Sequence, residues 1–199
     1  MKKDFVYLAS ASPRRSELLR QIGVPFQVRP AAIAEERLAR ETPEAYVARL
    51  AAAKAETIWA QAAGDSRPVL AADTAVVLDG DVLGKPETAT EAAAMLERLS
   101  GRTHRVLTAV ALRHAGGLET VLSESEVRFR ATTAAERLAY CRTGEPFDKA
   151  GGYGIQGHAA VFVEQLEGSY SGVVGLPLYE TAALLKRCGI DFWLSARAA

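Results

Sequence analysis

Cysteine and histidine are scarce in this chain of 199 residues, which contains two of the first and three of the second. Cys141 and Cys188 cannot form a disulfide framework, and their spacing matches no metal-ligand pattern. We expect both to be buried free thiols, because each lies in an apolar helical context. The three histidines are scattered along the chain, which argues against a histidine-based metal site.

The chain also lacks an excess of charge and any long apolar run. Lysine plus arginine and aspartate plus glutamate number 24 each, so there is no broad basic field for nucleic acid or a membrane surface. An anion would have to be bound by a local cluster. No apolar run reaches the roughly 18 residues of a membrane span, and the N-terminal segment is too short for a signal peptide. We therefore expect a cytoplasmic protein that binds neither nucleic acid nor membrane.

Strand-like and helix-like segments alternate along the chain, and no internal repeat is present. The expected helices cover residues 13–22, 43–63, 91–99, 134–141 and 178–187. The expected strands cover residues 5–9, 25–28, 69–72, 76–78, 81–83, 103–113, 119–130, 160–166 and 190–194. This mixture predicts a single domain over residues 1–199, with an α/β sheet and helices on its faces.

The most informative segment joins the apolar strand at 5–9 to the start of a helix. Ser12 is a good N-cap, and Pro13 suits the first helical position because its missing N–H costs nothing there. Arg14 and Arg15 lie in the first turn, beside unpaired backbone N–H groups and the positive end of the helix dipole. The segment predicts a phosphate site, with two solvated arginines as the alternative.

Two ionisable side chains occur at positions where solvation is not expected. Lys54 shares the apolar stripe of the helix that begins after Thr42, so its ammonium group must either reach solvent or meet a partner. Asp73 and Thr74 follow the apolar strand at 69–72, where open α/β sheets place ligand-contacting groups. A carboxylate there can bind a metal ion, act as a general base or cap a turn.

Residues 148–157 include four glycines and Gln156. The side-chain amide of Gln156 offers a donor and an acceptor, which the edge of a uracil or thymine ring could use. The alternative is a flexible surface turn, against which the apolar Tyr153 and Ile155 count. Lys85 lies in a loop where a lysine is usually solvated. No G-x-x-x-x-G-K-[ST] motif is present and no G-x-G-x-x-G follows a strand, which disfavours the common nucleotide-binding folds.

Six motifs occur in the order and at the spacing typical of one family. They are Ser10-Ala11-Ser12-Pro13-Arg14-Arg15, Ala72-Asp73-Thr74, Gly84-Lys85-Pro86, Ser100-Gly101-Arg102-Thr103-His104, Asp148-Lys149-Ala150-Gly151 with Tyr153-Gly154-Ile155-Gln156-Gly157, and Val173-Val174-Gly175-Leu176-Pro177. Residues 8–185 thereby resemble the Maf family of nucleoside triphosphate pyrophosphatases, in the branch that acts on dTTP and UTP. The resemblance implies a mixed twisted sheet flanked by helices, similar to the inosine triphosphate pyrophosphatases, with substrate in a cleft between two lobes.

The resemblance also implies a reaction: hydrolysis of a nucleoside triphosphate between its α- and β-phosphates, with Mg²⁺ or Mn²⁺ as cofactor. The matching catalytic positions are Asp73, Lys54, Lys85 and Glu35, and the matching substrate-binding positions are Ser10, Arg14, Thr74 and Gln156. Asp73 matches the proposed proton acceptor, and Asp73 and Glu35 would hold the metal ion. The two lysines would face the phosphates.

Two positions depart from the family pattern. Ala34 stands where many relatives have an aspartate, so one metal contact of those relatives is expected to be missing here. Gly172 stands where many relatives have an asparagine. Three alternatives stay open: a pyrophosphatase for CTP or modified pyrimidine nucleotides, one for 7-methyl-GTP, and a nucleotide-binding regulator of septum formation. A homodimer is expected at the level of the family only.

Overall fold

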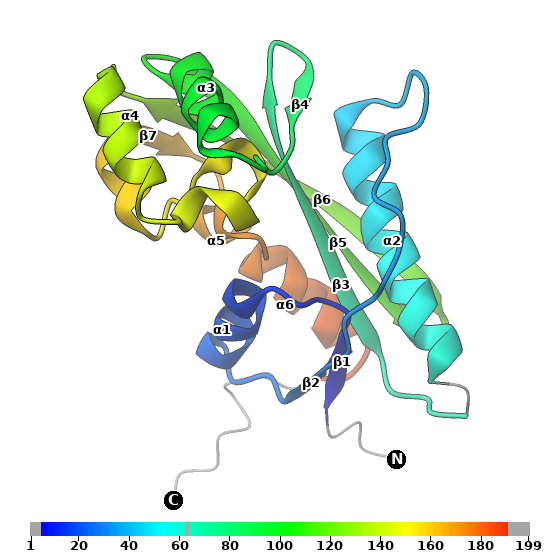
Figure 1. The fold of residues 1–199 in the computed structure, drawn as a ribbon. Helices are drawn as coiled ribbons and strands as arrows, with labels where there is room; N and C mark the ends of the chain where they lie inside the picture. Colours follow the sequence, from blue (N-terminus) through cyan, green and yellow to red (C-terminus); the bar gives the residue numbers. More distant parts are fainter. Residues whose placement is uncertain (1–4, 63, 191–199) are drawn as a thin grey trace, which may run out of the picture. The chain divides into compact units, whose positions relative to one another are not determined.

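The computed structural model describes residues 5–62 and 64–190 (Figure 1). The chain divides into two compact units, each made of several segments. The first comprises Met1–Asp73, Thr108–Ser123 and Gly175–Ala199, and the second comprises Thr74–Leu107 and Glu124–Val174. Three strands contribute residues to both units: β3 (Val69–Leu78), β5 (Thr103–His114) and β6 (Gly117–Phe129).

The strands of the described residues form one seven-stranded sheet in the order β2-β1-β3-β5-β6-β7, with β4 paired to β3. The shorter strands are β1 (Val6–Leu8), β2 (Phe26–Val28), β4 (Asp81–Leu83) and β7 (Val163–Glu167). Strand β1 pairs in parallel with β2 and β3, whereas the β3–β4 and β6–β7 pairs are antiparallel. The sheet is therefore mixed, and the expected α/β class with flanking helices is confirmed.

Three helices belong to the first unit: α1 (Pro13–Gln21), α2 (Pro43–Gln61) and α6 (Leu178–Arg187). The side chain of Thr42 caps α2 by accepting the Ala45 N–H at 3.2 Å, and this cap fixes where the helix begins. The buried side of α2 consists of Val47, Leu50, Ala51, Lys54, Ala55 and Ile58. This is the stripe expected from the helical period, with the lysine included.

Helix α1 begins where the sequence predicts, but its cap differs from the expectation. Ser12 occupies the N-cap position without a side-chain cap hydrogen bond. Its backbone N–H instead donates to the hydroxyl oxygen of Ser10 at 3.2 Å. The segment before α1 is therefore shaped by Ser10, which is buried.

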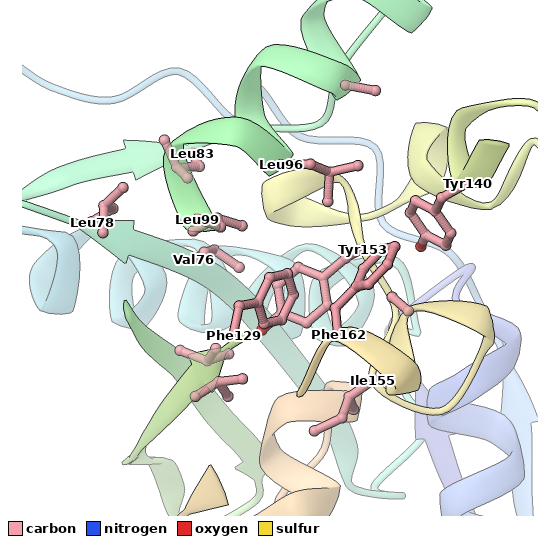
Figure 2. Packing of buried hydrophobic residues seen from close by; sticks show 14 of the residues in the cluster. Val76, Leu78, Leu83, Leu96, Leu99, Phe129, Tyr140, Tyr153, Ile155 and Phe162 are labelled. Atoms are coloured by element: carbon pink, nitrogen blue, oxygen red, sulfur yellow. The ribbon is translucent and has the colours of Figure 1, made fainter. Parts of the chain in front are cut away.

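The second unit contains α3 (Ala89–Leu99), α4 (Ala134–Cys141), α5 (Tyr170–Val174) and the 3₁₀ turns η1 (Glu145–Asp148), η2 (Ala150–Gly152) and η3 (His158–Phe162). Helices α3 and α4 lie side by side (Figure 1). Figure 2 shows the aromatic residues at the centre of this unit. The ring centroids of Phe129 and Tyr153 lie 4.8 Å apart. Tyr153 and Ile155 are buried in this core. The glycine-rich loop is thus anchored, and the flexible-turn alternative is wrong.

Two expected strand boundaries are wrong. Strand β3 runs without a break from Val69 to Leu78, so Asp73 lies inside a strand and not at its end. Strand β7 starts at Val163 because residues 158–162 form the η3 turn. The turn between β3 and β4 is as expected, since Asp79 and Gly80 have φ values of 54° and 85°. The short strand expected at 190–194 falls almost entirely outside the described residues.

Both cysteines are free thiols, but only Cys141 is buried. Cys188 is half-buried because it occupies the C-cap position of α6, where the helix ends. The expectation of two buried thiols is therefore wrong for Cys188.

Among the described helices, none combines the length and the apolar character that crossing a membrane requires.

His104 is buried in the second unit, and we expect it to make the stability of the fold depend on pH. Its Nε2 and the Tyr153 hydroxyl are hydrogen-bonded at 2.7 Å, while its buried Nδ1 has no hydrogen-bond partner among the described residues. Burial lowers the pKa of His104 from 6.5 to about 4. Between these values the unfolded chain binds the proton and the folded chain does not, so stability falls as the pH falls.

The free energy of unfolding is expected to fall by about 3 kcal/mol between pH 6.5 and pH 4. This value is the difference between the unfolded and folded pKa of His104, converted to free energy. Urea unfolding of the parent and of His104→Gln across this range would measure it. The difference between the two profiles isolates His104 from the carboxylates that titrate in the same range. Parallel profiles would contradict the prediction.

Candidate active site

Lys54 lies between two carboxylates in the first unit. Its Nζ is 2.6 Å from Oε1 of Glu35 and 2.6 Å from Oδ1 of Asp73. The side chains of Lys54 and Asp73 are each 10% exposed and that of Glu35 is 45% exposed. The sequence left open whether the Lys54 ammonium reaches solvent or meets a partner, and the structure shows that it meets partners. The arrangement brings three of the four expected catalytic positions together.

Glu35 lies outside regular secondary structure, and helix α2 holds its segment in place. The hydroxyl of Tyr46 donates to the backbone carbonyl of Glu35 at 2.8 Å. Arg49 donates to the backbone carbonyl of Glu36 at 3.0 Å and pairs with the Glu41 carboxylate at 2.6 Å. These contacts from one face of α2 explain how a loop carboxylate reaches Lys54. Sequence reasoning did not identify Tyr46 or Arg49 as supports.

Asp73 is a buried carboxylate with a raised pKa. Burial raises its pKa, the Lys54 ammonium lowers it again, and the net result is a pKa above the ordinary aspartate value. A buried carboxylate with a raised pKa is a stronger base than a solvated one. Asp73 can therefore accept a proton, which is the role that the family resemblance implies.

Ser10, Arg14 and Arg15 form a second group in the same unit. Arg15 donates from Nε to the Gly175 carbonyl at 2.8 Å and from Nη1 to the Ser10 hydroxyl at 3.1 Å. Burial lowers the pKa of Arg15, and the nearby carboxylate of Asp73 raises it. Arg14 is close enough to add a repulsive interaction with Arg15. Positive charge is thus concentrated at the start of α1.

Arg15 is not among the substrate-binding positions that the family resemblance implies, although its pKa responds to both Asp73 and Glu35. The implied substrate-binding position is Arg14. The signal in the sequence was present, because both arginines lie in the first helical turn. Both arginines are half-buried.

Thr74, Lys85 and Gln156 belong to the second unit. Lys85 and Gln156 are exposed, and Thr74 is half-buried in β3. The Gly151 N–H donates to the Gly84 carbonyl at 2.9 Å, so the loop that carries Lys85 is hydrogen-bonded to the glycine-rich loop. Gly151 has a φ of 71°, and a Cβ there would come within 2.8 Å of Val76. Only glycine fits this contact.

Asp73 and Glu35 are suited to a hard divalent cation. Both carboxylates converge on one ammonium group, and each has a second oxygen beyond the one that contacts Lys54. Mg²⁺ in nucleotide enzymes is commonly bound by one or two carboxylates together with phosphate oxygens and water. The carboxylates present therefore fit the implied metal.

His114, Glu119 and Cys188 form a different cluster, whose possible ligand atoms all lie within 4.8 Å of one another. His114 is the one histidine of this cluster. The Gly116 N–H donates to Nδ1 of His114 at 3.1 Å, so the ring proton is on Nε2, which faces Glu119 at 3.3 Å. Arg187 pairs with Glu119 at 2.7 Å. Both ring nitrogens of His114 and the carboxylate of Glu119 are thus already engaged in hydrogen bonds or an ion pair.

A family model described as Maf-like protein matches residues 5–188. A dTTP/UTP pyrophosphatase of Methylobacillus flagellatus is 53% identical to this chain over 93% of each sequence. A dTTP/UTP pyrophosphatase of Cupriavidus pinatubonensis is 51% identical over 95% of this chain and 99% of its own length. One from Burkholderia thailandensis is 50% identical over 94% and 95%. The chain belongs to the Maf-like protein family.

A solved structure, a nucleoside-triphosphatase or dITP/XTP pyrophosphatase of Mycobacterium abscessus, is also similar to this chain. It covers 92% of this chain with 16% identity and a TM-score of 0.43, and 93% of its own length is matched. This similarity is too low to support a conclusion about fold or function.

Proposed function

We propose that this protein hydrolyses dTTP and UTP to the nucleoside monophosphate and pyrophosphate. The observation that carries the proposal is Lys54, a buried lysine whose ammonium lies 2.6 Å from each of two carboxylates. Relatives about half identical to this chain over most of its length are named dTTP/UTP pyrophosphatases. That agreement supports the choice of reaction and of substrate.

The chemistry requires positive charge and one proton acceptor. A triphosphate carries about four negative charges, and more charge develops on the α-phosphoryl oxygens and the leaving pyrophosphate as water attacks. In the proposed reaction the water oxygen forms a bond to the α-phosphorus. The bond between the α-phosphorus and the oxygen that bridges it to the β-phosphorus breaks, and pyrophosphate leaves. Asp73 accepts the proton of that water. Arg14, Lys54 and Lys85 stabilise the phosphate charge.

A divalent cation, Mg²⁺ or Mn²⁺, belongs to the proposal, with Asp73 and Glu35 as its protein ligands. Such a cation supplies Lewis-acid stabilisation of phosphate oxygens. Lys54 contacts one oxygen of each carboxylate and thereby orients both of them. Ala34 adds no ligand at the position where many relatives have an aspartate.

Product analysis tests the proposal. The pure protein would be incubated with dTTP, UTP, CTP, GTP and 7-methyl-GTP, with and without Mg²⁺ or Mn²⁺. Metal-dependent release of pyrophosphate and monophosphate from dTTP and UTP is the expected result. A preference for 7-methyl-GTP would overturn the substrate assignment, and tight binding without turnover would favour a regulatory nucleotide-binding protein.

Gln156 is proposed to read the pyrimidine edge through its side-chain amide. Gln156→Ala is expected to lower the preference for UTP over CTP by about 10-fold or more, because an unpaired polar edge costs about 1–3 kcal/mol. The ratio of kcat/KM for the two nucleotides is the measurement. An unchanged ratio would show that Gln156 does not contact the base.

Three further expectations accompany the proposal: a single domain, a homodimer and a cytoplasmic location. One cooperative unfolding transition would support the first, because separate domains commonly unfold separately. Sedimentation equilibrium would test the second, and cell fractionation the third.

A further inference from the structure

The feature that the proposed function does not use is the carboxylate of Glu145. It lies at the start of η1, and its side chain is only 14% exposed. Oε1 accepts the hydroxyl of Tyr140 at 2.8 Å. Oε2 lies 2.9 Å from both the backbone N–H and the ring Nδ1 of His158. One side chain thus binds a helix α4 residue and the far end of the glycine-rich loop.

These contacts lie on both sides of Gln156. On the N-terminal side, the Gly154 N–H donates to the Tyr140 hydroxyl at 3.3 Å, and that hydroxyl donates to Glu145. On the C-terminal side, His158 contacts Glu145 directly. Gln156 lies two residues from each attachment point. A single carboxylate therefore holds both flanks of the exposed glutamine.

The chain between the two attachment points forms a tight turn. The Gly157 N–H donates to the Gly154 carbonyl at 3.0 Å, which leaves Ile155 and Gln156 as the central residues. Ile155 is buried in the core of the second unit, whereas Gln156 is exposed. A Cβ on Gly157 would overlap the Glu145 carboxylate. The turn is thus built closely around this acidic group.

The contacts require an ionised carboxylate. Burial raises the pKa of Glu145, but hydrogen bonds from His158 and Tyr140 outweigh it and hold the pKa below the usual glutamate value. An ionised carboxylate only accepts hydrogen bonds, and each donor here meets one of its oxygens. A glutamine at this position would remove the charge, and its NH₂ group would face either the His158 donors or the Tyr140 hydroxyl, which would then have to accept and not donate.

We propose that Glu145 is a positioning residue for nucleobase selection, which fixes the turn that presents Gln156 to the pyrimidine edge. The inference rests on the proposed function, because it deepens the role given to Gln156. Glu145 touches neither the base nor the phosphates in this role. Its loss is expected to weaken selectivity between bases more than it slows the reaction itself, since Lys54, Asp73 and Glu35 are in the other unit.

The test compares Glu145→Gln, Tyr140→Phe and the parent, with UTP and CTP as substrates. The expected result is a fall of about 10-fold in the UTP/CTP ratio of kcat/KM for Glu145→Gln, with kcat for UTP changed by less than about threefold. Tyr140→Phe removes only the hydroxyl that joins Glu145 to Gly154 and should lower the ratio in the same direction. Glu164→Gln, which alters an exposed ion pair with Arg128 in the same unit, is the matched control and should leave the ratio unchanged.

A double variant separates positioning from general destabilisation. If Glu145 acts through Gln156, then Glu145→Gln combined with Gln156→Ala should be no less selective than Gln156→Ala alone. Equal losses of activity toward both nucleotides, or additive losses in the double variant, would overturn the inference. If the parent prefers UTP and a folded Glu145→Gln protein keeps the same UTP/CTP ratio of kcat/KM, the inference is also overturned. A parent that hydrolyses neither nucleotide would overturn the proposed function itself, which is a distinguishable failure.

Discussion

Replacing Asp73 with asparagine is expected to lower kcat by about 10²–10⁴-fold, the range for loss of a general base or of an electrostatic group at the reacting atoms. Asparagine preserves the shape of the side chain but neither accepts a proton nor carries charge. Steady-state kinetics with dTTP and UTP would measure the loss. Asp81→Asn alters an exposed ion pair with Arg98 at 2.9 Å, and it should behave as the parent.

The Asp73→Asn variant should fold at least as stably as the parent. The raised pKa of Asp73 means that the folded protein disfavours the ionised form relative to the unfolded chain. Ionised Asp73 therefore costs stability at neutral pH, and a neutral asparagine removes that cost. Thermal unfolding at pH 7 would check this sign. Near-normal turnover in a folded Asp73→Asn protein would remove Asp73 from the mechanism.

Replacing Lys54 with methionine is expected to lower stability by about 3 kcal/mol and to abolish measurable turnover. The variant leaves Asp73, which is 10% exposed, without its cation, and breaking a buried ion pair commonly costs about 3–5 kcal/mol. The pKa of Asp73 should rise further, because Lys54 is the group that lowers it most. The loss of stability relative to the parent should therefore shrink as the pH falls and Asp73 becomes protonated.

A double variant identifies the source of that loss. Lys54→Met combined with Asp73→Asn removes the unpaired carboxylate and should recover most of the stability without recovering activity. Urea unfolding at pH 7 of the parent, the two single variants and the double variant gives the coupling between the two residues. A double variant as unstable as Lys54→Met alone would show that the pair with Asp73 is not the cause.

Local sequence signals predicted the elements that depend on neighbouring residues. Helix α4 begins where expected because Thr133 and Glu136 form a capping box, and α2 begins at its Thr42 cap. The turn at Asp79 and Gly80 has the backbone that these residue types favour. In each case the decisive contact is within a few residues of the chain.

The two errors in the strand boundaries came from contacts between distant residues. A break at Asp73 is a reasonable expectation for a polar residue in an apolar strand, but Lys54, 19 residues earlier, pairs with it there. The η3 turn replaces the start of an expected strand, and Glu145, 13 residues upstream, holds its first residue. The helical period placed Lys54 on the inner face of α2. It carried no information on which carboxylates would meet the ammonium.

Hydrolysis of UTP in water enriched in ¹⁸O tests the central claim most directly, because it reports which phosphorus the water attacks. We expect one ¹⁸O atom in the uridine monophosphate and none in the pyrophosphate, in the presence of Mg²⁺ or Mn²⁺. Label in the pyrophosphate would place the attack on the β-phosphorus. Release of labelled orthophosphate would place it on the γ-phosphorus. Either result would contradict the assignment of the Lys54, Glu35 and Asp73 cluster to cleavage by attack at the α-phosphorus.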